Sequence, residues 1–366
     1  MTNRFISLFF LIITQLFLTP YTSFSQSKDD AEINNRRNVI LMIGDGMGIS
    51  QIYSVMAATP DKLNITRCTN TALVITSSAN DDVTDSAAAG TAIATGTKTN
   101  NGSIGVDSAN KPLESMLKIA ERNGLSTGLV ATSDITHATP ASFIASVQNR
   151  GMTDDIAKQF LDTDIDVFIG GGLNAFSKRK DSINYIDSLR AADYNIATSL
   201  EELEKYHSGK LAGLLYPEHA PKIIDGRGNM LGNATSKALE LLSKNESGFF
   251  LMIEGSQIDW GGHDNDINYL QTELLDFDKA VGIAIDFAEK NPETLVIVTA
   301  DHETGGLTLI ESKTNKGKMN PVFSTDHHSG SPVGLFAFGK EAEKFNGIID
   351  NTDIFKLILS TYGFNK

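Results

Sequence analysis

The amino-acid sequence predicts an α/β protein: a three-layer sandwich with a large, mostly parallel central sheet flanked by helices. Two observations predict this fold class. Apolar runs of strand length adjoin polar loops, and amphipathic helical segments lie between the runs. Continuous apolar runs are typical of strands buried on both faces of a parallel sheet. Strands that alternate with helices along the chain are typical of an α/β sandwich.

Five apolar runs are the expected strands: NVILMI (38–43), LSTGLVAT (125–132), GFFLMI (248–253), TLVIVTA (294–300) and VGLFAFG (333–339). Two segments are expected helices: LESMLKIAERNG (113–124), which ends in a glycine typical of a C-cap, and YLQTELLDFDKAVGIAIDFAEK (269–290). Residues 151–230 are less regular. Within them FIGGGLNAF (168–176) lacks the GxGxxG spacing of dinucleotide sites, so we interpret it as a strand-to-loop turn.

The first 26 residues have the pattern of a secretory signal peptide: one arginine, an apolar run and a polar end with small residues. An uncleaved anchor is the alternative, although the apolar core is short and broken for a membrane span. Residues 27–366 are expected to form a single domain that is exported, to the periplasm or the medium, without a stable membrane anchor. Cys68 is the only cysteine, so no intrachain disulfide can form. An exported protein of this kind depends on its core, on bound metal or on association.

The charge of the chain excludes one class of function. The formal net charge is −14, and it becomes −15 when residues 1–26 are removed, since Arg4 is their only charged residue. A general nucleic-acid-binding protein needs basic surface for phosphate contacts, so specific nucleic-acid binding is not expected. Part of the acidity is ordinary solvated surface, and metal ligands would contribute to it as well.

Residue types that bind metals recur just past the ends of the expected strands. They are Asp45, His137, Glu254, Asp259, His263, Asp301 and His302. In open α/β sheets, ligands bind at this edge. Five of the seven histidines lie in these loops or in DHHSGS (326–331), whereas His207 and His219 are interpreted as ordinary surface residues.

Each of these motifs has an alternative interpretation when it is taken alone. DGMG (45–48) is a common turn sequence, DWGGH (259–263) could be a flexible loop with a surface histidine, and DHETGG (301–306) could be a strand-end cap. Together the motifs supply carboxylates and imidazoles for more than one ion. Imidazole with carboxylate favours zinc over magnesium, and the more oxygen-rich segment HATP (137–140) with Glu254 would suit a harder third ion.

The segment TDSAAAGTA (84–92) predicts a helix start, with Asp85 or Ser86 as the cap. A helix N-terminus offers free N–H groups and a partial positive charge to a phosphate. Paired metals are common machinery for displacement at phosphorus, so Ser86 is also a candidate nucleophile for phosphoryl transfer. Ser86 lacks the GxSxG elbow, which disfavours acyl transfer through a Ser-His-Asp triad. Asp85 could cap the helix or support the metal ligands.

Six motifs occur in an order that resembles the bacterial alkaline phosphatases: GDGMG, VTDSAAAGTAIATGTKTNNGSIGVD, ATSDITHATPASF, EGSQIDWGGH, VTADHETGG and HHSG. The resemblance runs from about residue 38 to the C-terminus, and the short loops are similar to the compact type. It implies an alkaline phosphatase-like catalytic domain over residues 27–366. It also implies a homodimer that hydrolyses small phosphomonoesters through a phosphoserine at alkaline pH, with two Zn²⁺ and one Mg²⁺ per subunit. Few specificity determinants beyond phosphate contacts are visible, so we expect a broad substrate range.

The resemblance also implies a role for each site residue. Ser86 would be the nucleophile, and Arg150 would grip two phosphate oxygens. The implied metal ligands are Asp259, His263 and His328 for the first zinc; Asp45, Asp301 and His302 with Ser86 for the second; and Asp45, Thr139 and Glu254 for the magnesium. His328 is preferred to its neighbour His327 because it stands at the family's ligand position.

Two residues depart from the best-known bacterial pattern. His137 stands where that pattern has Asp, which predicts weaker magnesium binding, or zinc in its place, at the third site. Trp260 stands where it has Lys, which removes a cation beside the phosphate and is expected to speed product release. The alternatives to a phosphomonoesterase are a phosphodiesterase, sulfatase or phosphomutase on the same fold, and a non-catalytic metal- or phosphate-binding protein in which Ser86 is only a cap.

Overall fold

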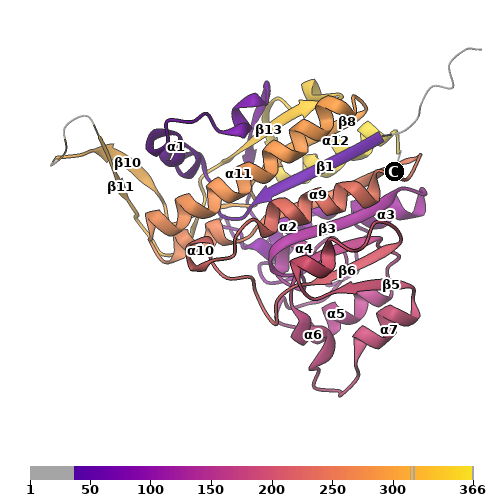
Figure 1. Cartoon of the computed structure of the whole chain (residues 1–366). Coiled ribbons are helices and arrows are strands. Elements are labelled where there is room, and N and C mark those ends of the chain that lie inside the picture. The colour runs from indigo at the N-terminus through magenta and orange to yellow at the C-terminus, as the bar shows by residue number, and fades with distance from the viewer. Residues whose placement is uncertain (1–36, 314, 316–317, 365–366) are drawn as a thin grey trace, which may run out of the picture. The chain divides into compact units, whose positions relative to one another are not determined.

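A ten-stranded sheet with helices on both faces forms the centre of the molecule in the computed structural model (Figure 1), which describes residues 37–313, 315 and 318–364. The strand order is β14-β2-β13-β8-β1-β7-β3-β4-β6-β5. The predicted α/β class with a large, mostly parallel central sheet is therefore confirmed. The predicted signal peptide, residues 1–26, lies outside the described residues.

The strands of this sheet are short to medium in length. Their bounds are β1 (Arg37–Gly44), β2 (Asn70–Ile75), β3 (Ser126–Asp134), β4 (Val167–Gly171), β5 (Tyr194–Ala197), β6 (Lys210–Leu214), β7 (Gly248–Gly255), β8 (Thr294–Thr299), β13 (Val333–Gly339) and β14 (Gly347–Asp350). Two small antiparallel pairs stand apart from it: β9 (Glu303–Thr304) with β12 (His328–Ser329), and β10 (Thr308–Glu311) with β11 (Met319–Val322).

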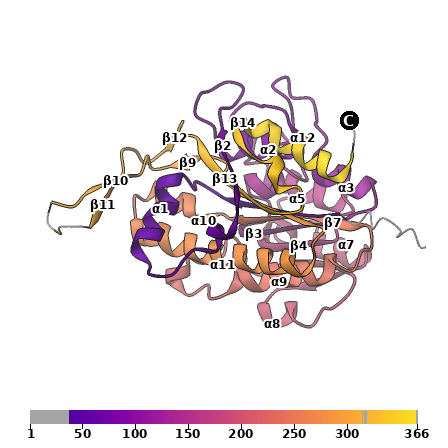
Figure 2. The same cartoon turned by 90° about the horizontal axis from the view of Figure 1, so that it is seen from above.

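Helices cover both faces of the sheet. They are α1 (Ile49–Ala58), α2 (Ser86–Thr95), α3 (Met116–Arg122), α4 (Ala138–Ala141), α5 (Thr153–Leu161), α6 (Leu173–Ser177), α7 (Tyr185–Ala191), α8 (Leu200–Leu203), α9 (Met230–Leu242), α10 (Gln257–His263), α11 (Ile267–Lys290) and α12 (Asn351–Tyr362), with short 3₁₀ segments at Asn64–Arg67, Ile223–Asp225 and Ala342–Lys344. Helices α9 and α11 lie on one face and α2 and α12 on the other (Figure 2). In the described part of the chain, none of these helices combines the length and apolar character needed to cross a membrane.

The central strands are parallel and completely buried. Strand β1 pairs in parallel with β7 on one side and with β8 on the other, and β7 pairs in parallel with β3. The side chains of residues 39–43 in β1 have no exposed surface. This burial on both faces explains why the sequence shows a continuous apolar run there. The fifth predicted run, β13, runs antiparallel to β8 and β2.

The region 151–230 contains three strands of the main sheet that the sequence analysis does not resolve. Strands β4, β6 and β5 extend the parallel sheet beyond β3 and are only four or five residues long. The predicted turn at 168–176 is present, because β4 ends at Gly171 and Gly172 adopts a positive φ of 97° before α6. Strands this short give too few residues for a recognisable pattern.

The segment DWGGH forms the helix α10 and not the flexible loop that the sequence suggests. Its glycines are needed for close packing. A Cβ on Gly261 would lie 2.6 Å from the Leu270 backbone, and one on Gly262 would lie 2.9 Å from the Thr304 carbonyl oxygen. The helix therefore places Asp259 and His263 one turn apart on the same face.

The loop between β6 and α9 is fastened to α11 by buried charges. Arg227 donates to both Glu273 and Asp276, and all three side chains are at most 3% exposed. Glu273 also accepts from the backbone N–H of Ile223 at 2.8 Å. Burial raises the pKa of Glu273 and of Asp276, and Arg227 opposes that shift. The guanidinium is thus the group that lets two buried carboxylates remain ionised.

Replacing Arg227 with methionine is expected to lower the free energy of unfolding by about 3–5 kcal/mol, because it leaves two carboxylates buried without their cation. The matched control is Arg190→Ala, which removes an exposed ion pair with Asp187 and should change stability by less than about 0.5 kcal/mol. Urea unfolding monitored by circular dichroism measures both. Equal effects of the two substitutions would contradict the assignment.

Candidate metal centre and active site

The candidate site lies at the carboxyl edge of four neighbouring parallel strands, β8, β1, β7 and β3. Parallel strands end at the same edge, so loops far apart in sequence meet there. Asp45 follows β1, Asp301 follows β8, and His137 lies three residues beyond β3. Glu254 is the next-to-last residue of β7, level with Ile43 of β1. The sequence places these residues just past strand ends, and the fold brings them together.

The first cluster consists of Asp259, His263 and His328. The Nε2 atoms of the two imidazoles lie only 3.2 Å apart. His263 Nδ1 faces the Asp326 carbonyl oxygen at 2.6 Å, and His328 Nδ1 faces the Thr84 carbonyl oxygen at 2.8 Å. A carbonyl can only accept, so each Nδ1 carries a proton, and the two Nε2 atoms face each other and the Asp259 carboxylate. This orientation by an outer carbonyl is typical of metal-binding histidines.

The carboxylate of the first cluster is held in the ionised state. His263 Nε2 lies 3.3 Å and His328 Nε2 3.6 Å from Asp259, and Thr304 Oγ1 donates to its Oδ1. Burial favours the neutral acid, but the hydrogen bond from His263 and the nearby imidazoles outweigh it and lower the pKa of Asp259. The Asp259 hydrogen bond raises the pKa of His263 to about 9. Burial and the neighbouring His302 lower the pKa of His328 to about 4.

The second cluster consists of Asp45, Asp301 and His302, whose ligand atoms lie within 4.8 Å of one another. All three side chains have no exposed surface. Both Asp45 oxygens and Asp301 Oδ2 have no hydrogen-bond partner among the described residues. Burial and the neighbouring carboxylates raise the pKa of Asp45 far above its usual value and that of Asp301 to about 6. Burial lowers the pKa of His302 to about 4.

The third cluster shares Asp45 and adds His137 and Glu254. Burial raises the pKa of Glu254 to about 7, and the hydroxyls of Ser256, Thr139 and Ser133 oppose the shift. Burial and the adjacent Arg150 lower the pKa of His137 to about 3, so this imidazole is neutral. Thr139, on α4, is thus within interaction range of Glu254, as the resemblance implies.

Ser86 is the first residue of α2 and only 2% exposed. Its Oγ lies 3.2 Å from His302 Nε2, which faces Asp45 and Asp301 at 3.4 Å and 3.3 Å. The hydroxyl therefore meets the second cluster at a helix N-terminus. The cap itself is Asp85, whose Oδ1 accepts from the Ala88 N–H at 2.9 Å.

The second carboxylate oxygen of Asp85 has partners of its own, in addition to the helix cap. Asp85 Oδ2 accepts from Arg150 at 3.1 Å and from the Gly102 N–H at 3.0 Å. Asp85 thus caps α2 and orients Arg150 beside Ser86. The other arm of the guanidinium lies 3.3 Å from His137 Nε2. Arg150 is about one third exposed, so its N–H groups can reach a bound anion.

Trp260 lies at the rim of the site in an aromatic group that the sequence analysis misses. The Trp260 ring packs edge-on against His137 and His219, with centroid distances of 6.2 Å and 4.8 Å. His219 is exposed, but its Nδ1 accepts from the Asp134 N–H at 2.9 Å. His219 is therefore a surface residue, as the sequence suggests, but it also contacts Trp260 and His137. His207 is exposed and pairs with Glu240, and the exposed His327 lies outside the first cluster.

The residues of the three clusters fit divalent cations. Two imidazole nitrogens that face each other are unfavourable unless a positive charge lies between them. Buried carboxylate oxygens without hydrogen-bond donors are unfavourable for the same reason. All three clusters combine imidazole with carboxylate, a donor set that zinc favours, and the third also has the Thr139 hydroxyl near it. The fold and this edge define a metal-dependent α/β enzyme.

The chain belongs to the alkaline phosphatase family, whose sequence model matches residues 36–322. Alkaline phosphatase 4 of Bacillus subtilis is 36% identical to it, over 91% of this chain and 90% of that protein. The alkaline phosphatase of Escherichia coli is 31% identical, over 92% of this chain and 88% of that protein. The chain is accordingly an enzyme, a phosphoric monoester hydrolase, as the sequence motifs predict.

Solved structures agree with this assignment. The alkaline phosphatase of the Antarctic bacterium TAB5 is 46% identical and superposes with a TM-score of 0.87, covering 90% of this chain and 99% of that one. A variant of the TAB5 enzyme with a histidine replaced by aspartate has Mg bound in its M3 site. That variant is 45% identical and has the same TM-score, covering 90% of this chain and 98% of its own.

The metal-free protein is expected to lose stability as the pH rises from about 7 to about 9. Folding raises the pKa of Glu254 only to about 7, so its contribution is lost below this range, and the pKa of Asp45, raised far above its usual value, gives a loss of the same sign. His263, with a pKa of about 9, loses its charged form in the same window. His302 and His328, with pKa values of about 4, are neutral in both states there.

Bound cations should remove most of this loss, because they stabilise the ionised carboxylates. Thermal unfolding across this pH range, with chelator-treated and zinc-reconstituted protein side by side, measures the effect. Identical pH slopes for the two forms would show that these carboxylates do not control the stability of the site.

Proposed function

We propose that the enzyme hydrolyses small phosphomonoesters of broad variety through a phosphoserine at Ser86. The observation that carries this proposal is the position of the Ser86 hydroxyl. It lies at the N-terminus of α2, 3.2 Å from His302 of the second cluster, and Arg150 is oriented beside it by Asp85. A nucleophile, a guanidinium and a helix N-terminus thus surround one place for a phosphate.

Two Zn²⁺ and one Mg²⁺ per subunit are the proposed cofactors. Asp259, His263 and His328 would hold the first zinc, and the second cluster with Ser86 would hold the second. The third cluster with Thr139 would hold the magnesium. When bound, these cations supply Lewis-acid stabilisation of deprotonated oxygens at the serine, the attacking water and the leaving group.

The residues of the chain then act in two in-line displacements. Ser86 Oγ attacks phosphorus while Arg150 donates to two phosphate oxygens, the bond to the ester oxygen breaks, and the alcohol leaves. Water then attacks the phosphoserine, the bond from phosphorus to Oγ breaks, and inorganic phosphate leaves with Ser86 restored. Both attacking oxygens must lose a proton, so the rate is expected to rise toward alkaline pH.

His137 gives the third site a property of its own. A guanidinium can only donate, so His137 Nε2 accepts from Arg150 at 3.3 Å, and the ring proton then lies on Nδ1. Nδ1 is buried without a hydrogen-bond partner among the described residues. In this arrangement His137 offers no lone pair at Nδ1, so contact with Arg150 competes with metal binding. The Mg in the M3 site of the TAB5 variant with aspartate for histidine supports the idea that a carboxylate favours Mg.

Export and dimer formation complete the proposal. Residues 1–26 would be removed as a signal peptide, leaving residues 27–366 as one catalytic domain in the periplasm or the medium. Mass spectrometry of the extracytoplasmic protein would show the processed N-terminus, and an intact one would contradict export by this route. The homodimer implied by the family resemblance is supported by the exposed apolar side chains of Ile49 and Tyr53 on α1. Sedimentation of the protein as a monomer at micromolar concentration would contradict the proposed homodimer.

Replacing Ser86 with alanine is expected to lower kcat/KM for a phosphomonoester by at least about a thousandfold, since the nucleophile is lost. The wild-type enzyme, quenched in acid during turnover, should carry one phosphate on the peptide containing Ser86. The matched control is Ser142→Ala, a buried serine whose hydroxyl donates to the Ala138 carbonyl on α4. An unchanged rate in Ser86→Ala would contradict the proposal. A larger rate with a diester or a sulfate ester would instead favour the related enzyme classes.

Replacing Trp260 with lysine is expected to tighten inhibition by inorganic phosphate by about tenfold, because it restores a charge-assisted hydrogen bond to the anion. Steady-state inhibition by inorganic phosphate measures this, and His219→Ala controls for simple loss of the aromatic contact at Trp260. An unchanged inhibition constant in Trp260→Lys would show that Trp260 does not set phosphate release.

A further inference from the structure

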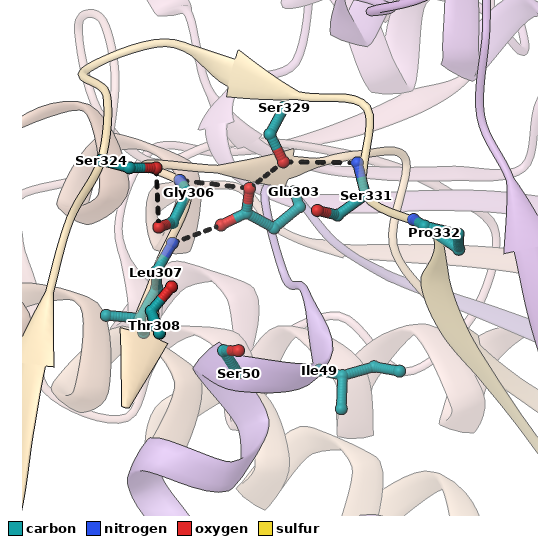
Figure 3. Close-up of a pocket in the computed structure, with 10 residues that line it drawn as sticks. All are labelled: Ile49, Ser50, Glu303, Gly306, Leu307, Thr308, Ser324, Ser329, Ser331 and Pro332. Carbon is teal, nitrogen blue, oxygen red and sulfur yellow. Dashed lines mark hydrogen bonds between the residues drawn. The ribbon is translucent and has the colours of Figure 1, made fainter. Parts of the chain in front are cut away.

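Glu303 is a buried carboxylate behind the first cluster to which the proposed mechanism gives no role. It follows His302 in the chain and is 4% exposed. It borders a cavity of about 260 Å³ that is also lined by Ser329, Ser331, Gly306 and Leu307. Figure 3 shows one of its oxygens directed at Gly306 and Ser329 and the other at Leu307. No ion pair joins it to a cation among the described residues, so neutral donors alone stabilise its charge.

Four donors surround the Glu303 carboxylate. Oε1 accepts from the Leu307 N–H at 3.0 Å and from the Gln51 side chain. Oε2 accepts from the Gly306 N–H at 3.2 Å and from the Ser329 hydroxyl (Figure 3). One side chain therefore joins helix α1, the turn after β9 and the strand β12. Of its partners, Gln51 lies 252 residues and Ser329 26 residues away in the sequence.

The contact with Ser329 links Glu303 to a candidate metal ligand. Ser329 directly follows His328, and the two residues form β12, which pairs with Glu303 and Thr304 of β9. This pair of strands is only two residues long, so few backbone hydrogen bonds fix its position. His328 must nevertheless hold its Nε2 within 3.2 Å of His263 Nε2.

We propose that Glu303 is a positioning residue for the first cluster: by clamping Ser329 to the turn after β9, it fixes the strand that carries His328. The inference rests on the proposed function, because the first cluster is there assigned to zinc. Outer contacts of this kind orient metal ligands, and their loss commonly lowers metal affinity by about 10–100-fold.

The clamp requires a carboxylate and not merely a side chain of this size. A glutamine at position 303 offers one acceptor oxygen, and its NH₂ group would face two donors. Whichever way the amide turns, at least one of the backbone N–H groups of Gly306 and Leu307 loses its acceptor. The Ser329 hydroxyl can rotate to suit the amide, but the backbone N–H groups of the turn cannot. Glu303→Gln therefore loosens the clamp while keeping the volume of the side chain.

The test is the rate at which a colorimetric zinc chelator removes zinc from the holoenzyme. Zinc in the first and second clusters is expected to leave in two separate phases. The phase that is absent in His263→Ala is assigned to the first cluster. In Glu303→Gln this phase should be about 10–100-fold faster, with the other phase unchanged. Excess zinc should restore the activity of the variant, which a general folding defect would not allow.

Ser329→Ala and a control complete the design. Ser329→Ala should speed the same phase, and adding it to Glu303→Gln should give little further effect, because both remove one interaction. Ser324→Ala is the matched control: its hydroxyl donates to the Gly306 carbonyl in the same turn without touching Glu303. If Glu303→Gln does not fold, the rate of zinc removal from Ser329→Ala alone tests the inference.

Three outcomes would overturn the inference: an unchanged first phase in both variants, equal acceleration of both phases, or additive effects in the double variant. A wild-type enzyme that holds no zinc would instead contradict the proposed cofactors. The two failures are therefore distinguishable.

Discussion

Buried negative charge at one edge of the sheet is the constraint on which the rest of this structure depends. Asp45, Asp301 and Glu254 have no exposed surface, and each has at least one oxygen without a donor among the described residues. Burial raises the pKa of all three, and nearby carboxylates add to it: Asp301 and Glu254 at Asp45, Asp301 at Glu254, and Asp259 at Asp301. A fold that retains such a group keeps it protonated or compensates it with cations, and in the proposed function the same cations serve the reaction.

The parallel sheet makes this arrangement possible. Neighbouring strands β8, β1, β7 and β3 are buried, and the residues at or just past their ends supply candidate metal ligands at one edge of the sheet. Short additions refine the positions: α10 sets Asp259 and His263 one turn apart, and the cap of α2 brings Ser86 to His302. Asp85 accepts from both a backbone N–H and Arg150, so the cap of α2 and the position of Arg150 depend on one residue.

Much of the fold could be predicted from the sequence, because its central strands are buried on both faces. The run at 38–43 is therefore unmistakable, whereas β4, β5 and β6 are too short to stand out. The contact of His219 with Trp260 was missed for that reason, since His219 lies in the loop after β6 and the edge of that strand was not recognised. The helical form of DWGGH also could not be foreseen, because its glycines reflect close contacts with Leu270 and Thr304 that only the fold creates. Glu303 gives no local signal, because its contacts with Gln51 and Ser329 are created only by the fold.

The central claim is that the first and second clusters are cation sites, and anomalous diffraction from crystals of zinc-loaded enzyme tests it most directly. The account predicts two strong peaks at the zinc edge. One should lie among Asp259, His263 and His328, and the other among Asp45, Asp301 and His302 beside Ser86. Zinc found only elsewhere, or these residues left in mutual contact without an ion at saturating zinc, would contradict it.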